Sequence, residues 1–225
     1  MEWSRLRAFD PEIEAFLDAY PMMRHRPTVA GAVRLAGRLV FSAFSEGLPE
    51  LGDEYRVQID IAKPLDQSLP QVFETGGRIA RERVNHVNPD GSLCLGSLLS
   101  QRLVLGAKPT LTDFVEKCVI PFLYAHSLRE QGLALFPFGE LEHGEQGLID
   151  DYLKIFGVPD SASLRLLMKM LALKRRRANK LSCICGCGRR FAACGLHARA
   201  HAARRTLSRL DIKRAYKEIW FEDAH

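Results

Sequence analysis

The chain has 225 residues, 47% hydrophobic and 26% charged, which is ordinary for a globular protein of one domain plus an extension. No apolar run approaches the roughly 20 residues of a membrane-spanning helix, and the first residues lack a secretory signal core. We therefore expect a cytoplasmic protein with no membrane partner. In a reducing compartment its six cysteines should be metal ligands, catalytic groups or buried thiols rather than disulfides.

Charge divides the chain into two parts. Residues 1–164 hold 16 Lys and Arg against 23 Asp and Glu, a net charge of −7. Residues 165–225 hold 16 against 4, a net charge of +12. A basic segment of this kind typically binds a nucleic acid, an acidic protein or the acidic part of its own chain. It is also compatible with a solvated basic helix that has no partner.

The first half of the sequence predicts a helix followed by strands. Asp10 and Pro11 favour a helix start, since Asp caps a helix and Pro fits its first position. Several later segments are rich in apolar residues, and two of them alternate with polar residues at the period of half-buried antiparallel strands. The expected strands span residues 33–41, 55–61, 71–75 and 78–85.

A helical period begins at Thr110, where Thr110 and Asp113 resemble a capping box. Pro121 should kink or end this helix, and Cys118 on its apolar face should be a core thiol. Further helices are expected over residues 148–156 and 161–173, and after a second capping box at Ser208 and Asp211. The order of elements predicts an α+β fold.

Cys94 follows the turn signal Asn88-Pro89-Asp90-Gly91, so it should lie just beyond a loop and be open to a bulky partner. With a pKa near 8.5, only a few per cent of a free thiol is thiolate at neutral pH, and its surroundings can raise that fraction. His86 and Asn88 are close enough in sequence to help form the site. An Asn amide can donate a hydrogen bond to the oxyanion of a thioester under attack. A buried thiol without chemistry fits the same spacing.

The motifs around Cys94 resemble those of ubiquitin-conjugating enzymes. That family has a strand, a proline-rich loop, a Pro-x-Val-x-Phe strand, a His-Pro-Asn tripeptide and a Gly-x-Ile/Leu-Cys-Leu active site. The matching segments here are 55–61, 64–75, His86-Val87-Asn88 and Gly91-Ser92-Leu93-Cys94-Leu95. The resemblance implies an N-terminal helix, a four-stranded antiparallel meander and C-terminal helices. It also implies that Cys94 forms the thioester, that Asn88 is the oxyanion-related asparagine and that His86 is structural.

Some positions depart from the eukaryotic pattern. Val87 replaces the usual Pro, the loop from Asn88 to Cys94 is shorter, and Gly96 stands where many members have an acidic residue. These differences resemble a bacterial branch encoded beside a cGAS/DncV-like nucleotidyltransferase in cyclic-oligonucleotide anti-phage operons. Membership would imply a thioester between Cys94 and the C-terminus of that nucleotidyltransferase, or of a ubiquitin-like protein. The acyl group would then pass to a lysine or other nucleophile.

A cysteine-rich knuckle lies near the C-terminal end, with four cysteines in residues 183–194. Thiolates and imidazoles bind Zn²⁺ tetrahedrally, and a closed structural site needs four of them. The Cys-x-Cys-x8-Cys spacing resembles the zinc motif at the C-terminal end of the bacterial preprotein-translocase ATPase. We expect structural Zn²⁺ on a set of three cysteines and one further residue. The expected ligands are Cys183, Cys185, Cys194 and His197, with Cys187 and His201 as alternatives to His197.

The expected organisation is a thioester domain over residues 1–160 and a basic helical extension over 161–225, with the zinc knuckle at about 183–201. One function is an enzyme, a cysteine acyl transferase whose extension docks the nucleotidyltransferase, the target or a nucleic acid. The other is a non-catalytic adaptor that binds a protein or nucleic acid through its basic zinc-containing region. The presence of Cys94 with His86 and Asn88 favours the enzyme.

Overall fold

A computed structural model describes residues 10–28, 32–62, 64–65, 67–133 and 144–220. It divides into two compact units, Met1–Leu95 with Lys108–Gly139, and Gly96–Ala107 with Glu140–His225. The predicted boundary near residue 160 differs from this division. Leu99, Tyr152 and Phe156 share one apolar core with the later helices, which places two helices before residue 160 in the second unit.

The first unit combines helices with a four-stranded antiparallel sheet, as the sequence predicts, in the order β1-β2-β3-β4. Its elements are α2 (Asp10–Ala19), β1 (Met23–Arg26), β2 (Val33–Ala43), β3 (Leu51–Ile61), β4 (Gln71–Glu74), the 3-10 helix η1 (Arg83–Asn85), α4 (Leu111–Phe114), the π-helix η2 (Val115–Val119) and α5 (Ile120–Glu130). In β3, Val57 and Ile59 are fully buried between exposed or half-buried neighbours, so the alternating pattern sets the face that packs.

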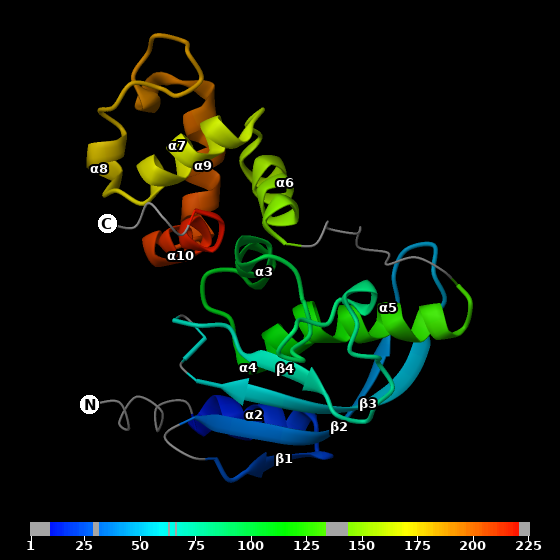
Figure 1. Cartoon of the computed structure of the whole chain (residues 1–225). Coiled ribbons are helices and arrows are strands. Elements are labelled where there is room, and N and C mark those ends of the chain that lie inside the picture. The colour runs from blue at the N-terminus through cyan, green and yellow to red at the C-terminus, as the bar shows by residue number, and fades with distance from the viewer. Residues whose placement is uncertain (1–9, 29–31, 63, 66, 134–143, 221–225) are drawn as a thin grey trace. The chain divides into compact units, whose positions relative to one another are not determined.

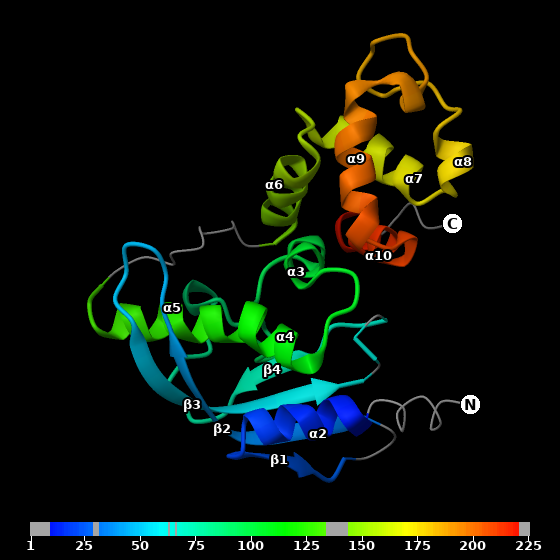
Figure 2. The same ribbon diagram turned by 180° about the vertical axis from the view of Figure 1, so that it is seen from behind.

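Helix α5 lies across one face of this sheet (Figures 1 and 2). It contacts β2 and β3, and its Ser127 hydroxyl lies 3.1 Å from the buried Tyr55 hydroxyl of β3. The predicted capping box of Thr110 and Asp113 begins α4. The helical path does not end at Pro121, because the wide π turn of η2 comes directly before it and accommodates the missing backbone donor.

The predicted fourth strand at residues 78–85 is wrong, and β1 occupies the outer position of the sheet instead. The buried carboxylate of Glu74 accepts the backbone N–H groups of Gly76, Gly77 and Arg78 at 2.6, 2.9 and 3.1 Å. These bonds turn the chain away from the sheet as β4 ends. The strand that sequence patterning missed, β1, has only one buried residue, Met23.

The second unit is helical among its described residues. Its elements are α3 (Leu98–Leu105), α6 (Glu145–Phe156), α7 (Ser161–Leu171), α8 (Arg175–Ala178), the 3-10 helix η3 (Phe191–Ala193), α9 (Gly195–Thr206) and α10 (Arg209–Ile219). Asp160 caps α7, which lies within the predicted helix at residues 161–173, and the predicted Ser208–Asp211 capping box begins α10. No described helix has the length and apolar character needed to cross a membrane.

Candidate functional site

Cys94 comes directly after a tight hairpin. The Gly91 N–H donates to the Asn88 carbonyl at 2.8 Å, and the Asn88 N–H donates to the Ser92 carbonyl at 2.8 Å. Pro89 suits the second position of this turn, and Gly91 has a φ of +86°, a left-handed conformation that favours glycine. The turn signal in the sequence therefore forms the hairpin that presents Cys94.

Backbone hydrogen bonds place Cys94 at the sheet. The Cys94 N–H donates to the His86 carbonyl at 2.8 Å, and the Leu93 N–H donates to the Val72 carbonyl of β4 at 2.7 Å. His86 has a φ of 53°, which is uncommon for a residue with a side chain. The Cys94 side chain is partly exposed. The structure thus brings His86 and Cys94 together through the backbone, on a short loop anchored to β4.

Asn88 has a different environment from the one expected of an oxyanion donor. Its side-chain nitrogen donates to the Ser92 hydroxyl at 3.0 Å, and that hydroxyl donates to Asp90 at 2.7 Å. The hydroxyl and the backbone N–H of Ser92 both donate to Asp90, and these two bonds lower the pKa of Asp90. The Asn88 amide therefore stabilises the hairpin in this conformation, and no described bond joins it to Cys94.

Sequence reasoning missed His126, whose imidazole is buried below this loop. Its Nε2 lies 3.1 Å from the Asn85 carbonyl oxygen, and its ring packs on Phe122 at a centroid distance of 4.7 Å. Burial lowers its pKa from 6.5 to about 4, so the ring is neutral at pH 7. Its position four residues after the apolar Phe122 on a predicted helix was the sequence signal that could have placed His126 on the buried face. His126 holds the backbone one residue before His86, which in turn binds the Cys94 amide.

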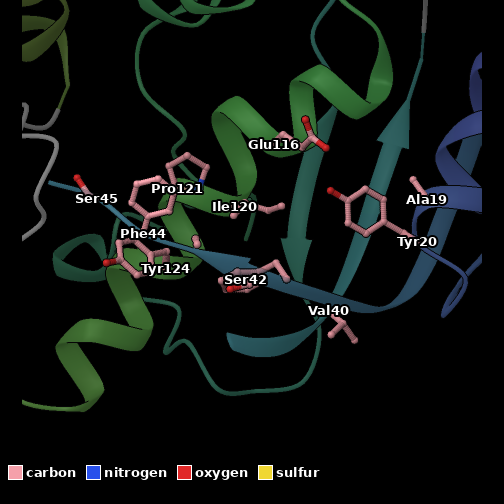
Figure 3. Close-up of a pocket in the computed structure, with 12 residues that line it drawn as sticks. Ala19, Tyr20, Val40, Ser42, Phe44, Ser45, Glu116, Ile120, Pro121 and Tyr124 are labelled. Carbon is pink, nitrogen blue, oxygen red and sulfur yellow. The ribbon is translucent and has the colours of Figure 1, made fainter. Parts of the chain in front are cut away.

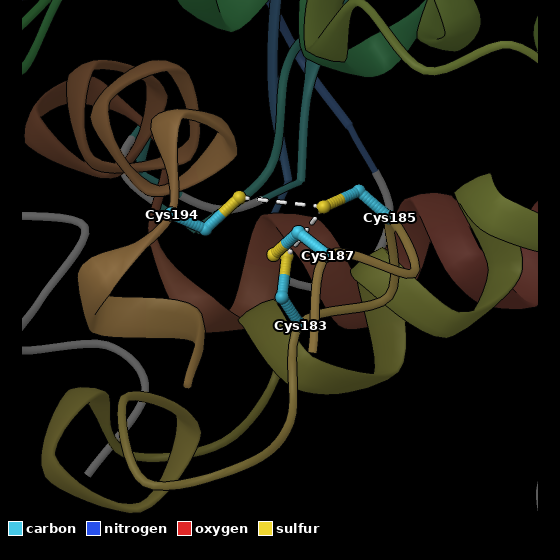
Figure 4. A group of neighbouring side chains, drawn as sticks. All are labelled: Cys183, Cys185, Cys187 and Cys194. Carbon is cyan, nitrogen blue, oxygen red and sulfur yellow. Dashed lines mark hydrogen bonds between the residues drawn. The ribbon is translucent and has the colours of Figure 1, made fainter. Parts of the chain in front are cut away.

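The second candidate site is a group of four cysteines in the second unit. The sulfur atoms of Cys183, Cys185, Cys187 and Cys194 all lie within 4.8 Å of one another (Figure 4). The Sγ atoms of Cys183 and Cys185 are 3.2 Å apart, and those of Cys185 and Cys194 are 3.4 Å apart. Zn–S bonds of about 2.3 Å in a tetrahedron place sulfurs about 3.8 Å apart. The four sulfurs therefore fit a metal ion such as Zn²⁺.

The chain path explains why these thiols converge. The Cys183 N–H donates to the Arg189 carbonyl at 2.8 Å and closes the knuckle. Gly186 and Gly188 have φ values of +75° and +69°, which side-chain-bearing residues rarely adopt. The buried ring of Phe191 anchors the knuckle in the apolar core, and Cys194 immediately precedes α9.

The thiols differ in their protonation. A backbone hydrogen bond from Arg189 lowers the pKa of Cys187 to about 6. Burial raises the pKa of Cys183 to about 12. A bound divalent metal would favour the thiolate form of all four, since it binds the deprotonated sulfur.

The fourth member of the group is Cys187, in place of the expected His197. His197 lies in the first turn of α9, and its Nε2 is 3.2 Å from the Oδ1 of Asn179. Its ring makes T-shaped contacts with Phe191 at a centroid distance of 5.2 Å and with His201 at 5.6 Å. The two histidines thus support the knuckle from outside the sulfur group.

The first unit also has a groove of about 560 Å³ between the end of α2, β2 and the start of α5 (Figure 3). Tyr20 and Glu116 lie at one end, and Phe44 with Pro121 and Tyr124 lies at the other. Burial and Glu116 together raise the pKa of Tyr20 to about 12. None of the twelve lining residues is a cysteine or a histidine, so the groove shares no reactive group with either candidate site.

Comparisons with known proteins give no match: no family model, no curated protein and no solved structure matches the chain.

Proposed function

We propose that the chain is a ubiquitin-conjugating-type acyl transferase in which Cys94 is the nucleophile. The observation that carries the proposal is a partly exposed thiol on a short hairpin that backbone hydrogen bonds tie to β4 and His86. The motif order around Cys94 supports it, as does the sequence of a helix, a four-stranded antiparallel meander and then the cysteine. The ubiquitin-conjugating fold and the bacterial anti-phage branch are part of this proposal.

The reaction has two transfers. The Cys94 thiolate attacks the carbonyl carbon of a protein C-terminus that another enzyme has activated as a thioester or acyl-adenylate. A new thioester forms, and the activating group leaves. An acceptor amine then attacks this thioester, the Cys94 sulfur leaves as thiolate, and the amine loses a proton as the amide forms. The proposed donor is the C-terminus of a cGAS/DncV-like nucleotidyltransferase or of a ubiquitin-like protein.

We assign the four-cysteine group a structural role with Zn²⁺. Four thiolates complete a tetrahedral site and leave no open position for substrate or water. Metal binding also supplies folding free energy to a segment that has few buried residues of its own, chiefly Cys183 and Phe191. The acyl transfer therefore depends on Cys94, and the metal on the cysteines of the other unit.

The test compares the wild type with Cys94→Ser in cells that also produce the proposed donor, a cGAS/DncV-like nucleotidyltransferase or a ubiquitin-like protein, and an enzyme that activates its C-terminus. The wild type should form an adduct that a thiol reductant releases, and Cys94→Ser should trap a reductant-resistant ester. Cys118→Ser is the matched control, because Cys118 is buried and its burial raises the pKa of its thiol to about 11. A wild type without any adduct, or an adduct that needs Cys118 and not Cys94, would refute the proposal.

A further inference from the structure

The second unit contains a long segment without acidic residues. Residues 161–210 hold 13 Lys and Arg and no Asp or Glu. Among the described residues, none of the basic side chains between 174 and 209 forms an ion pair with a carboxylate. Asp211, which directly follows this segment, is buried and pairs with Arg102 at 3.1 Å. Among the described residues, these side chains therefore have no carboxylate partner, and the negative charge beside them comes from the knuckle thiols, of which Cys187 bonds to Arg189.

The fold gathers cations from α8, α9 and the start of α10. Asn179, at the end of α8, lies 3.2 Å from His197 in the first turn of α9, so the two helices adjoin. Arg204 of α9 donates to the Leu171 carbonyl at 2.9 Å and so lies beside the end of α7, close to where α8 begins. Burial lowers the pKa of Arg204, and the nearby charges of Arg175 and Arg209 lower it further. We call the basic residues of α8 and α9 the cationic surface.

The chemistry of this surface favours phosphate over an acidic protein. Protein–protein interfaces have a desolvated core rich in aromatic residues. The exposed positions of α9 hold instead Gly195, Ala198, Arg199, Ala202 and Arg205, and Arg175 to Arg177 of α8 are exposed. Guanidinium groups bind phosphate oxygens in a planar two-pronged geometry, and small side chains between them allow a close approach. Protein–nucleic acid interfaces are polar and strongly cationic in this way.

We propose that the cationic surface binds the phosphate backbone of a nucleic acid, without sequence preference. The metal centre positions the surface, because the knuckle that it closes lies between α8 and α9 in the chain. This inference goes beyond acyl transfer at Cys94, and it concerns residues of the other unit only. It can hold or fail whatever Cys94 does.

The test uses the full-length, zinc-loaded chain and a fluorescent DNA duplex of about 20 base pairs with random sequence, at 50 to 200 mM salt. Each phosphate contact makes the affinity fall about 3.5-fold over this range, because bound counterions are released. The variant Arg175→Gln/Arg176→Gln/Arg177→Gln should bind more weakly. If all three arginines contact phosphate, the factor by which the affinity falls between 50 and 200 mM salt should be about 40 times smaller for this variant than for the wild type.

A matched control removes three positive charges from exposed positions of the first unit. The variant Arg56→Gln/Arg81→Gln/Lys108→Gln has the same net charge as the test variant. It should bind the duplex within about twofold of the wild type. Zinc content measured on all three proteins shows that the knuckle is intact.

Three outcomes would overturn the proposal. The first is that neither the DNA duplex nor an RNA duplex of the same sequence binds at 50 mM salt. The second is an equal loss in the test and control variants, which would indicate net charge alone. The third is binding of polyglutamate that neither duplex displaces, which would indicate an acidic protein partner.

Discussion

The choice between Cys187 and His197 as fourth metal ligand makes a sharp prediction. Apparent binding free energies of structural zinc in small domains are about 10–16 kcal/mol, so one of four equal ligands contributes about 2.5–4 kcal/mol. At about 1.4 kcal/mol per factor of ten, Cys187→Ser should weaken zinc binding by about two to three orders of magnitude. His197→Gln should leave the affinity close to that of the wild type, because His197 bonds to Asn179 and lies outside the sulfur group.

The assay is metal content after dialysis against a chelator of graded concentration, with one zinc per chain expected for the wild type and His197→Gln. Circular dichroism should show that Cys187→Ser keeps most of its helix, because Cys183 and Phe191 are the only knuckle residues fully within the apolar core of the second unit, whose other members come chiefly from the helices. Zinc retained at wild-type affinity by Cys187→Ser, together with zinc lost from His197→Gln, would refute the four-cysteine assignment.

Three further predictions concern stability. Burial holds the pKa of His126 at about 4, against 6.5 in the unfolded chain, so the unfolded state takes up a proton first as pH falls. The folded state should therefore lose up to about 3 kcal/mol of stability between pH 6.5 and pH 4. Urea unfolding at pH 7 and pH 5 should show this loss in the wild type and not in His126→Gln. Arg102 and Asp211 form a buried ion pair, so Arg102→Met should lower the free energy of unfolding by about 3–5 kcal/mol, because it leaves the Asp211 carboxylate buried without a partner. Adding Asp211→Asn should restore part of this stability. A single Arg102→Met variant more stable than the wild type would contradict the prediction. Arg78 holds the pKa of Asp53 near 2, so thermal unfolding should show Asp53→Asn destabilised by about 1 kcal/mol at pH 7 and by less at pH 2.

Local signals in the sequence predicted much of the fold. Alternation marked the two long strands, β2 and β3, and side chains that bond to nearby backbone marked the starts of α4 and α10. Such signals depend only on neighbours within a few residues, so they can be read from the sequence without knowing the rest of the fold. The cysteine after the turn was predictable for the same reason, since Asn88 to Gly91 form their own hydrogen bonds.

The elements that were missed depend on distant parts of the chain. Strand β1 exists because β2 offers it an edge, and its own sequence, Met23–Arg26, has one buried residue. Helix α9 is rich in Ala, Arg and His, and its buried positions are the small residues Ala200 and Ala203, so its apolar stripe gives only a weak periodic signal. The fourth member of the cysteine group was also unpredictable from spacing. The left-handed glycines at 186 and 188 decide where the Cys187 side chain points.

The six cysteines now fall into three chemical environments, and this division is the strongest argument for Cys94 as the nucleophile. Cys118 is buried in the first unit, and burial raises its pKa to about 11, so it stays protonated and out of reach. Four others converge on one another, where a metal would occupy their lone pairs and block attack on a carbonyl. Cys94 alone combines partial exposure of the residue with a loop that the sheet holds in place. A protein that needed thiols only for structure would have no reason to present one there.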